Sequence, residues 1–259
     1  MLFNNFNFNK FLLSKSSMRS LHVIMPMAGE GSRFVNEGWS VPKPLIEVKG
    51  KPLFLRAIES LPKDIEIKYS FIVRQNHIES HHIDERIKYH LPNANIFSVS
   101  KTTRGAVETC LVADSAIDDN DAVIILDCDL EFKSKDFIDN IKALLNVSHT
   151  KCGGVLLSFK SDLPKYSYAE TDKDGFVIRT AEKEVISDNA LCGAYFFTSG
   201  RRFKEIAREL LNEANFSKPE FYVSLLYNYL LRDNEYVQLT PIDEYYSYGT
   251  PEELKQYTI

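Results

Sequence analysis

Small residues and one arginine follow the first apolar stretch of the sequence. Leu21–Met25 is apolar, and it runs into Pro-Met-Ala-Gly-Glu-Gly-Ser-Arg-Phe, which ends at Phe34. Glycines let backbone amides approach an anion, and successive N–H groups in such a turn form a cradle for phosphate. The guanidinium of Arg33 suits phosphate oxygens, and Lys43, between two prolines, adds a mobile charge. The segment predicts a phosphate-binding loop of neither the Walker A nor the Gly-x-Gly-x-x-Gly type, with a surface turn as the alternative.

Two carboxylates stand at the end of a continuous apolar run. Asp127 and Asp129 flank Cys128 directly after residues 122–126. Carboxylate oxygens are hard ligands, suited to Mg2+ or Mn2+ when the ion is held together with substrate phosphates. A solvated strand end is the alternative interpretation of the same pattern.

A charged pair and an isolated glycine occur later in the chain. The carboxylate of Glu182 beside the ammonium of Lys183 could hold a phosphate compound, with Glu182 on a hydroxyl or amino group and Lys183 on the phosphate. Such pairs are also common on surfaces. Gly193 interrupts the apolar segment Leu191–Phe197, which predicts a β-bulge or a backbone that a ligand approaches closely.

Composition excludes several classes of protein. Of 259 residues 44% are hydrophobic and 26% charged, and the net charge of -5 offers no basic surface for nucleic acid. No apolar run approaches the roughly 20 residues that cross a bilayer, so no membrane insertion is expected. Widely spaced cysteines predict buried free thiols in a reducing compartment: Cys110, Cys128, Cys152 and Cys192.

The first half of the chain alternates strands and helices. Strands are predicted at 21–25, 65–73, 94–99 and 121–127, and helices at 53–61, 77–89, 105–117 and before Asn146. This order indicates a mostly parallel sheet with right-handed crossovers, in which ligands sit beyond the carboxyl ends of the strands. The glycine loop, Gly105 and Asp127–Asp129 are therefore expected to converge on one crevice.

The second half is richer in strands. The turn signal Asp172-Lys-Asp-Gly lies between Tyr166–Thr171 and Phe176–Arg179, which predicts a hairpin. No linker rich in proline, glycine or serine separates the halves, so a single domain of two lobes is expected.

The amino-terminal residues differ from the rest. Residues 1–19 are rich in Asn, Phe, Ser and Lys, and we expect them to form a poorly ordered extension. They contain no apolar stretch of signal-peptide length, which predicts a cytoplasmic location. The predicted domain then covers residues 20–259.

Taken in order, these segments resemble the signature of the nucleotide-sugar pyrophosphorylase superfamily of nucleotidyltransferases. The resemblance runs from about Leu21 to Leu254 and covers nearly the whole chain. The matching segments are Gly29-Glu-Gly31-Ser-Arg33, Pro42-Lys43-Pro44-Leu45, Gly50-Lys-Pro52, Leu126-Asp127-Cys128-Asp129, Glu182-Lys183, Gly193-Ala-Tyr195-Phe196 and Gly249-Thr250-Pro251-Glu252.

The resemblance implies a GT-A-like α/β fold. This is a three-layer, Rossmann-like and mostly parallel mixed sheet flanked by helices, with a nucleotide-binding lobe at 20–150 and a smaller, β-rich acceptor-binding lobe at 151–259. It also implies a reaction in which a phosphate oxygen of the acceptor attacks the α-phosphorus of a nucleoside triphosphate and expels pyrophosphate. Because that nucleophile is already an anion, positioning and charge neutralisation suffice without a general base.

Specific residues take roles under this resemblance. Arg33, Lys43 and Asp129 would be catalytic, and Asp129 with Asp127 would hold Mg2+, or Mn2+. The implied nucleotide-binding residues are Met27, Ala28, Gly29, Glu30, Gly31, Ser32, Arg33, Thr103, Gly105, Ala106 and Asp127. The implied acceptor-binding residues are Lys43, Glu182, Lys183, Gly193 and Tyr195.

One position departs from the family pattern. Many members carry a second metal-binding aspartate two residues before the carboxyl-terminal Gly-Thr, where this chain has Ser247. Asp127, Asp243 and Glu244 are the alternatives for the second ligand.

The opening and ending resemble a subgroup linked to bacterial capsule and surface-polysaccharide modification. That subgroup includes the cytidylyltransferase of the capsular phosphoramidate pathway. For this chain, the resemblance favours CTP as the donor. It favours a sugar phosphate, or a small non-sugar phosphate such as a phosphorylated amino acid or polyol, as the acceptor. The expected partners are these small molecules, and a homo-oligomer is left open. The alternatives are a GT-A glycosyltransferase that consumes a nucleotide-sugar, and a non-catalytic nucleotide-binding protein, for which Ser247 is the argument.

Overall fold

The computed structural model describes residues 18–147, 149–213, 216 and 218–257. Residues 1–17 of the expected extension lie outside this part of the chain. Arg19 belongs to the fold, because its guanidinium donates hydrogen bonds to the carbonyl oxygens of Leu144, at 2.7 Å, and Thr198, at 2.6 Å. The boundary of the extension therefore lies before Arg19.

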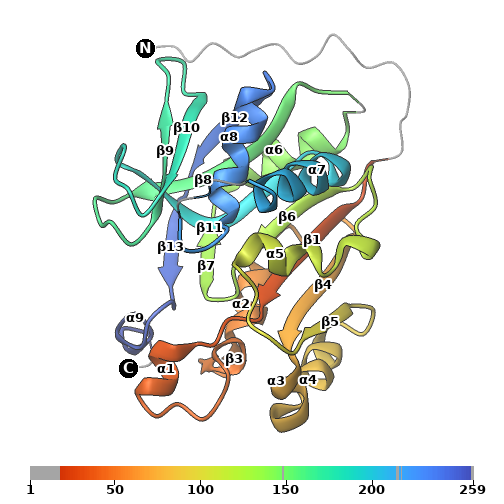
Figure 1. The fold of residues 1–259 in the computed structure, drawn as a ribbon, viewed down its shortest axis with the longest axis vertical. Coiled ribbons are helices and arrows are strands. Elements are labelled where there is room, and N and C mark those ends of the chain that lie inside the picture. Colours follow the sequence, from red (N-terminus) through yellow and green to blue (C-terminus); the bar gives the residue numbers. More distant parts are fainter. Residues whose placement is uncertain (1–17, 148, 214–215, 217, 258–259) are drawn as a thin grey trace.

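The first half of the chain alternates strands and helices (Figure 1). Its elements are β1 (Leu21–Met27), α1 (Ser32–Asn36), β2 (Glu47–Val48), β3 (Lys51–Pro52), α2 (Leu53–Glu59), β4 (Ile67–Arg74), α3 (Gln75–His81), α4 (Ile83–His90), β5 (Asn95–Val99), α5 (Ala106–Leu111), β6 (Ala122–Leu126), β7 (Leu130–Lys133) and α6 (Lys135–Leu145). The predicted alternation is confirmed.

The second half supplies more strands than helices. Its elements are β8 (Cys152–Lys160), β9 (Ser167–Thr171), β10 (Val177–Glu182), β11 (Asn189–Phe197), α7 (Gly200–Leu211), α8 (Leu226–Arg232), β12 (Tyr236–Pro241), β13 (Glu244–Ser247) and α9 (Pro251–Lys255). The predicted hairpin is confirmed, since β9 and β10 pair antiparallel.

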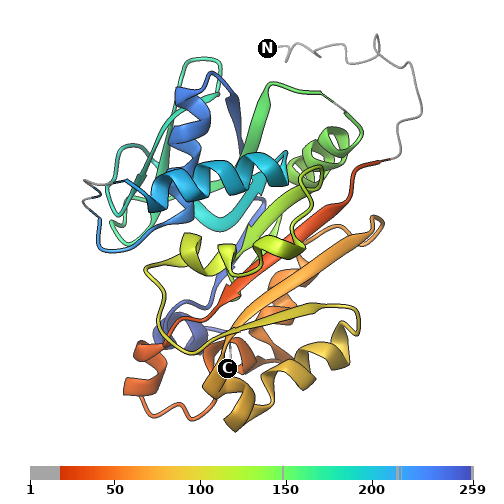
Figure 2. The same ribbon diagram turned by 45° about the vertical axis from the view of Figure 1, so that its right-hand side comes forward.

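One nine-stranded mixed sheet runs through both halves (Figure 2). Its main order is β10-β9-β11-β6-β1-β4-β5, and β8 joins it by pairing with β11 and β12. The centre, β6-β1-β4-β5, is parallel, as predicted. β11 pairs antiparallel with β6 and so carries the sheet across residue 150 without a break.

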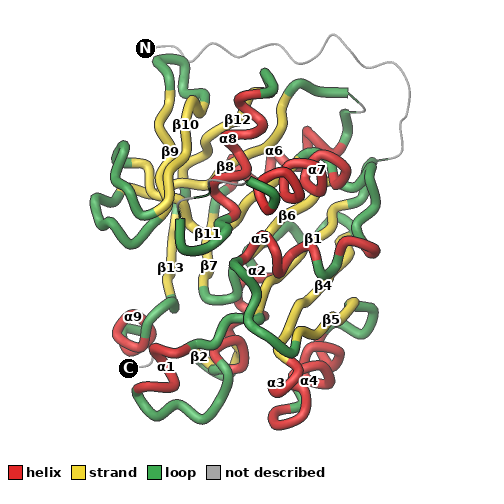
Figure 3. The backbone as a smooth tube through the Cα atoms, in the orientation of Figure 1, coloured by secondary structure: helices red, strands yellow, loops and turns green. Residues whose placement is uncertain are grey.

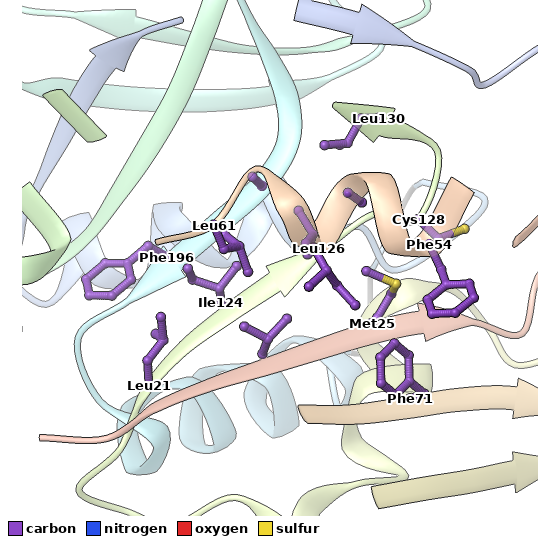
Figure 4. Close-up of a cluster of buried hydrophobic side chains, with 14 of the residues drawn as sticks. Leu21, Met25, Phe54, Leu61, Phe71, Ile124, Leu126, Cys128, Leu130 and Phe196 are labelled. Atoms are coloured by element: carbon purple, nitrogen blue, oxygen red, sulfur yellow. The ribbon is translucent and has the colours of Figure 1, made fainter. Parts of the chain in front are cut away.

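Helices cover both faces of this sheet and complete three layers. Successive side chains of β1 point to opposite faces, so Leu21, Val23 and Met25 enter one core while Ile24 enters the other. The first core packs against α2, α4 and α6, and the second against α5, α7 and α8. Figure 4 shows the first core, in which Phe54 of α2 meets Phe71 of β4 edge to face at 5.9 Å. The α/β fold class is thus confirmed.

A third, smaller cluster joins the two ends of the domain. Phe34 of α1 shares it with Tyr248 and Leu254 from the carboxyl terminus, and all three side chains are buried. The cluster holds α9 beside α1, as both ribbon views show (Figures 1 and 2). The end of the chain is thereby brought to the loop that follows β1.

Three local expectations need correction. The helix predicted at 77–89 is two helices, because His82 adopts a left-handed conformation with φ of 50°. The helix predicted at 105–117 ends at Leu111 and is followed by a 3-10 turn over Asp114–Ala116. The small β7–β13 sheet was not predicted, and Figure 3 shows it leading into α9.

Candidate active site

A cavity of about 250 Å3 lies where the loops after β1 and β6 meet β9, β10, β11 and the carboxyl-terminal segment. The structure brings predicted residues from distant parts of the sequence to its walls. They are Arg33, Ala106, Asp127, Asp129, Glu182, Gly193 and Tyr195. The predicted convergence of the loops after β1 and β6 is confirmed.

The glycine loop turns sharply before α1. Gly31 has φ of 62°, and its carbonyl accepts hydrogen bonds from the amides of Phe34 and Val35 at 2.9 and 3.1 Å. Met27 and Ala28 are buried below the loop, whereas Gly29, Glu30, Ser32 and Arg33 are exposed. The guanidinium of Arg33 has no ion-pair partner among the described residues. An exposed cation on the cavity wall is therefore free to meet an anion.

Lys43 and Asp129 form an ion pair at the cavity. Nζ of Lys43 lies 2.7 Å from Oδ2 of Asp129, and the two side chains are 26% and 20% exposed. Burial by itself lowers the pKa of Lys43, but the charge of Asp129 outweighs it and the net pKa lies above the usual value for lysine. A Cβ at Gly31 would lie only 3.8 Å from Cβ of Lys43, so the glycine loop and the proline-flanked lysine are neighbours.

Asp127 lies against the backbone of Gly193. Its amide donates a 2.9 Å hydrogen bond to the carbonyl of Gly193, and a Cβ at Gly193 would lie 2.4 Å from its Oδ2. Burial, and then the charge of Asp129, raises the pKa of Asp127 above its ordinary value. The register of β11 against β8 shifts between Leu191 and Tyr195, which confirms the predicted bulge.

Glu182 is a buried carboxylate at the inner end of the cavity. Its Oε2 accepts hydrogen bonds from the hydroxyls of Ser167 and of Ser224, the latter at 2.9 Å. Lys183 is not among the residues that line the cavity, so its direct contact with an acceptor stays a prediction. Its ammonium donates to the hydroxyl of Tyr222 at 2.9 Å, and Tyr222 lines the cavity. The backbone of Lys183 is left-handed, with φ of 55°.

The segment before α5 is fixed by contacts of its own. Hydroxyl oxygens of Thr103 and Thr109 are 2.6 Å apart. Gly105 has φ of 139°, and a Cβ there would lie 2.5 Å from the amide nitrogen of Phe221. Only glycine permits this approach, which seats Ala106 at the cavity while Thr103 and Gly105 stay outside its wall. Glu30 is tied to the same segment, since the Thr102 hydroxyl donates to it at 2.8 Å.

Two charged cavity residues were missed by sequence reasoning, Lys165 and Glu253. They line the wall together with Asp129 and with Ser247, the position at which the chain departs from the family pattern. Ser247 donates a 2.8 Å hydrogen bond to Glu253, which also pairs with Lys165. A sequence signal existed for Glu253 alone, because Thr250 and Glu253 have the spacing of a capping box, which α9 forms.

Two of the alternatives for a second metal ligand lie elsewhere. Oδ2 of Asp243 accepts from the amide of Lys135 at 3.0 Å, and Glu244 pairs with Lys133 at 2.8 Å. Neither residue is among those that line the cavity, and each has a partner elsewhere. Within the part of the chain that the structure describes, no three histidine, cysteine or acidic side chains gather as a metal site.

The four cysteines are all buried and free, as predicted. Burial raises the pKa of Cys128 and that of Cys192 to about 12, so neither thiol ionises at neutral pH. Thiolate chemistry in the cavity is thereby excluded at that pH.

The fold and the cavity define a three-layer α/β protein with a charged cavity at one edge of its sheet, and the comparisons show its family. A model of the nucleotidyl transferase family matches residues 22–256, and the chain belongs to that family. Members of the family typically use divalent metal ions. No curated protein gives a match.

Two solved structures share the fold. A nucleoside-diphosphate-sugar pyrophosphorylase from Vibrio cholerae RC9 superposes with a TM-score of 0.75 at 24% identity, over 91% of this chain and 99% of that one. A Bacillus anthracis protein assigned as a glucose-1-phosphate thymidylyltransferase, solved with sucrose, gives a TM-score of 0.72 at 19% identity, over 92% and 94% of the chains. None of the described helices is long and apolar enough to span a membrane.

Proposed function

We propose that this nucleotidyl transferase transfers a nucleoside monophosphate from a nucleoside triphosphate to a phosphorylated small molecule. CTP is the favoured donor. The observation that carries the proposal is the Lys43–Asp129 ion pair, because the carboxylate of Asp129 lines the same cavity as Arg33. Together, these three residues supply a protonated ammonium, a guanidinium and a carboxylate suited to a divalent cation. That combination neutralises a triphosphate from more than one side.

The triphosphate would lie along the loop after β1. Amides between Ala28 and Ser32 and the guanidinium of Arg33 bind its β- and γ-phosphates, with Met27 and Glu30 framing the loop. The nucleoside then extends toward Thr103, Gly105 and Ala106, the segment that is tied to the loop by the Thr102–Glu30 hydrogen bond.

Lys43 is the residue nearest the bonds that change. A phosphate oxygen of the acceptor forms a bond to the α-phosphorus, and the bond from that phosphorus to the bridging oxygen breaks. The electron pair of the broken bond leaves with pyrophosphate. A lysine ammonium beside phosphate oxygens stays protonated at neutral pH, so its charge offsets that of the α-phosphate and of the incoming phosphate.

Asp129 would hold the divalent cation, and Asp127, the second ligand that the sequence predicts, lies on the same cavity wall. Two hard carboxylates and no third ligating side chain suit Mg2+, which completes its coordination with phosphates and water. When bound, Mg2+ would neutralise charge on the phosphates and help to orient them.

The acceptor would occupy the inner end of the cavity. Glu182 keeps accepting capacity beyond its two serine hydrogen bonds, because a carboxylate offers about four lone-pair sites. With Tyr195 and the backbone of Gly193 it can receive hydroxyl or amino groups. Lys183 would act through Tyr222, to which it is hydrogen-bonded.

The narrower identity rests on resemblance. The Ile-Met-Pro-Met-Ala-Gly opening and the ending with Ser247 support a CTP-dependent enzyme of capsule or surface-polysaccharide precursor synthesis. On that basis the acceptor is a sugar phosphate or a small phosphorylated amino acid or polyol.

The function is tested by pyrophosphate release with Mg2+. ATP, CTP, GTP and UTP are each combined with phosphorylated sugars, amino acids, polyols and choline, and CTP is expected to give turnover with one class of acceptor. Lys43→Ala and Asp129→Ala are each expected to lower turnover about 10²–10³-fold, as for other preorganised charge contacts. Lys51→Ala is the control, because Lys51 does not line the cavity. Its Nζ pairs with Oε1 of Glu59 at a distance of 2.7 Å.

Other outcomes would contradict the proposal. Near-normal turnover in Lys43→Ala or Asp129→Ala would remove the assigned roles. Hydrolysis or transfer from a nucleotide-sugar without pyrophosphate release would indicate a glycosyltransferase. Tight binding of a nucleoside triphosphate with no turnover on any acceptor would indicate a non-catalytic nucleotide-binding protein.

A further inference from the structure

The carboxylate of Glu253 borders the same small space as that of Asp129. A Cβ at Gly249 would lie 3.3 Å from Oδ2 of Asp129 and 3.3 Å from Oε2 of Glu253. The glycine thus leaves open a gap between two carboxylate oxygens that any other residue would partly fill. Both acidic residues line the cavity.

The fold fixes Glu253 in this place. β13 pairs with β7, which begins directly after Asp129, and Ser247 is the partner of Leu130 in that register. The amide of Tyr248 donates a 2.8 Å hydrogen bond to the carbonyl of Asp129. The capping box of α9 then orients Glu253, whose Oε2 accepts from the amide of Thr250 at 3.2 Å.

Each of the two carboxylates is paired with its own lysine. Lys43 contacts Oδ2 of Asp129 at 2.7 Å, and Lys165 contacts Oε1 of Glu253. Two carboxylate–ammonium pairs therefore lie at the cavity, whose wall includes Asp129, Lys165 and Glu253. A divalent cation can take the place of the two ammonium groups at the carboxylates, and the phosphates can receive those ammonium groups, so each charged group keeps a partner of opposite sign.

We propose that Glu253 is the second carboxylate of the divalent-cation site, together with Asp129, and that Lys43 and Lys165 hold these carboxylates until cation and triphosphate bind. Ser247 then supports Glu253 by its hydrogen bond instead of supplying a ligand itself. On substrate binding the two ammonium groups pass to phosphate oxygens. The inference rests on the proposed nucleotidyl transfer, but it concerns cation binding alone.

The test measures Mn2+ binding to the full chain by electron paramagnetic resonance, without and with inorganic tripolyphosphate. Glu253→Gln keeps an oxygen for Ser247 and for the amide of Thr250 but removes the charge. It is expected to weaken Mn2+ binding roughly 10- to 100-fold, the range seen when groups around a bound metal are changed. Glu252→Gln is the control, because Glu252 is exposed on the same helical turn and is not on the cavity wall, and its affinity is expected to stay unchanged.

Two further variants predict effects of the opposite sign. Lys165→Met leaves Glu253 and its cap intact but removes the competing ammonium, so Mn2+ is expected to bind more tightly without tripolyphosphate. The same variant is expected to gain less from added tripolyphosphate, since one phosphate contact is lost. Ser247→Asp in the Glu253→Gln background is expected to restore Mn2+ affinity.

The outcomes separate this inference from the proposed function. Equal Mn2+ affinities of Glu253→Gln and the unchanged chain would overturn it, as would equal losses in Glu253→Gln and Glu252→Gln. Unchanged or weaker binding in Lys165→Met would overturn the exchange of partners. A chain that binds Mn2+ as stated but releases no pyrophosphate would refute the proposed function and support this inference.

Discussion

Lys43 and Gly193 show how single residues shape the cavity. Lys43 is a cation whose partner, Asp129, raises its pKa, so it stays charged beside any bound phosphate. Gly193 acts by what it lacks, because its missing side chain makes room for the carboxylate of Asp127. A single residue thus determines the positive charge at Lys43, and another determines the space for the Asp127 carboxylate at Gly193.

Gly193→Ala is predicted to disturb Asp127 as well as stability. The new Cβ would lie 2.4 Å from Oδ2 of Asp127, and the alanine backbone would have to keep the left-handed φ of 90°. Together the clash and the strained backbone are expected to reduce the free energy of unfolding by about 1–3 kcal/mol. Turnover should fall with it. Urea unfolding and pyrophosphate release measure the two effects.

Gly175→Ala is the matched control for this substitution. Gly175 has a similar φ of 86°, but a Cβ there meets nothing within 4 Å. It should show the backbone penalty alone and keep its activity. If both variants lose stability equally and both stay active, the clash with Asp127 has no role.

At the scale of elements, short caps and short strands place the carboxyl terminus. β7 and β13 have only 4 residues each, yet their pairing brings Ser247 level with the start of β7. α9 has 5 residues and depends on its capping box and on the buried side chain of Leu254. Such a helix is marginal by itself, and tertiary packing holds it.

Thr250→Ala is predicted to loosen α9 selectively. The substitution removes the N-cap hydrogen bond, in which the amide of Glu253 donates to the Thr250 hydroxyl at 3.3 Å. Loss of an N-cap costs about 1 kcal/mol. Hydrogen exchange of residues 251–257 should accelerate, and Mn2+ binding should weaken.

Ser199→Ala serves as the comparison. Ser199 caps α7 by accepting from the amide of Arg202 at 3.3 Å, so a similar loss of stability is expected. Exchange in α9 should stay unchanged, because α7 lies on the sheet and not at the carboxyl terminus. Faster exchange of α9 in both variants would show that the effect is global.

At the scale of the whole molecule, one sheet and one small cluster tie the halves together. β11 enters the sheet beside β6, so the cavity residues from both halves of the chain are carried by one continuous sheet. The chain end then returns to α1 through the third core cluster. Because the core is continuous, buried groups far from the cavity contribute to global stability.

His22 makes that stability depend on pH. His22 belongs to β1 and is fully buried, and its Nε2 lies 2.8 Å from the hydroxyl of Ser70 on β4. Burial lowers the pKa of His22 to about 4. Above pH 6.5 His22 is neutral in both states and contributes no pH dependence. Between about 6.5 and 4 only the unfolded chain takes up the proton, so the free energy of unfolding should fall with pH by up to about 3 kcal/mol.

Urea midpoints measured from pH 7.5 to 4.5 test this contribution. His22→Gln keeps a partner for Ser70 and cannot titrate, so its unfolding free energy should vary less with pH over that window. His149→Gln, at an exposed histidine, should retain the full dependence. Identical pH profiles for His22→Gln and the unchanged chain would disprove the assignment.

The sequence alone determined those features that depend on near neighbours. The alternating elements, the hairpin, the bulge at Gly193 and the glycine turn before Arg33 all follow from short patterns of side-chain size, polarity and backbone freedom. The carboxylates after β6 followed from the rule that parallel strands present their carboxyl ends at one edge. These expectations needed no knowledge of which distant segments pair.

The tertiary structure decided which distant groups meet. The β7–β13 pairing places Glu253 near Asp129, and the loop before β9 brings Lys165 to Glu253. The ammonium of Lys183 donates to the hydroxyl of Tyr222, a residue of the cavity wall. Such contacts depend on register and on burial of the third cluster, which are long-range and cooperative. For that reason the glycine turn before Arg33 could be predicted from residues in order, whereas the approach of Glu253 to Asp129 could not.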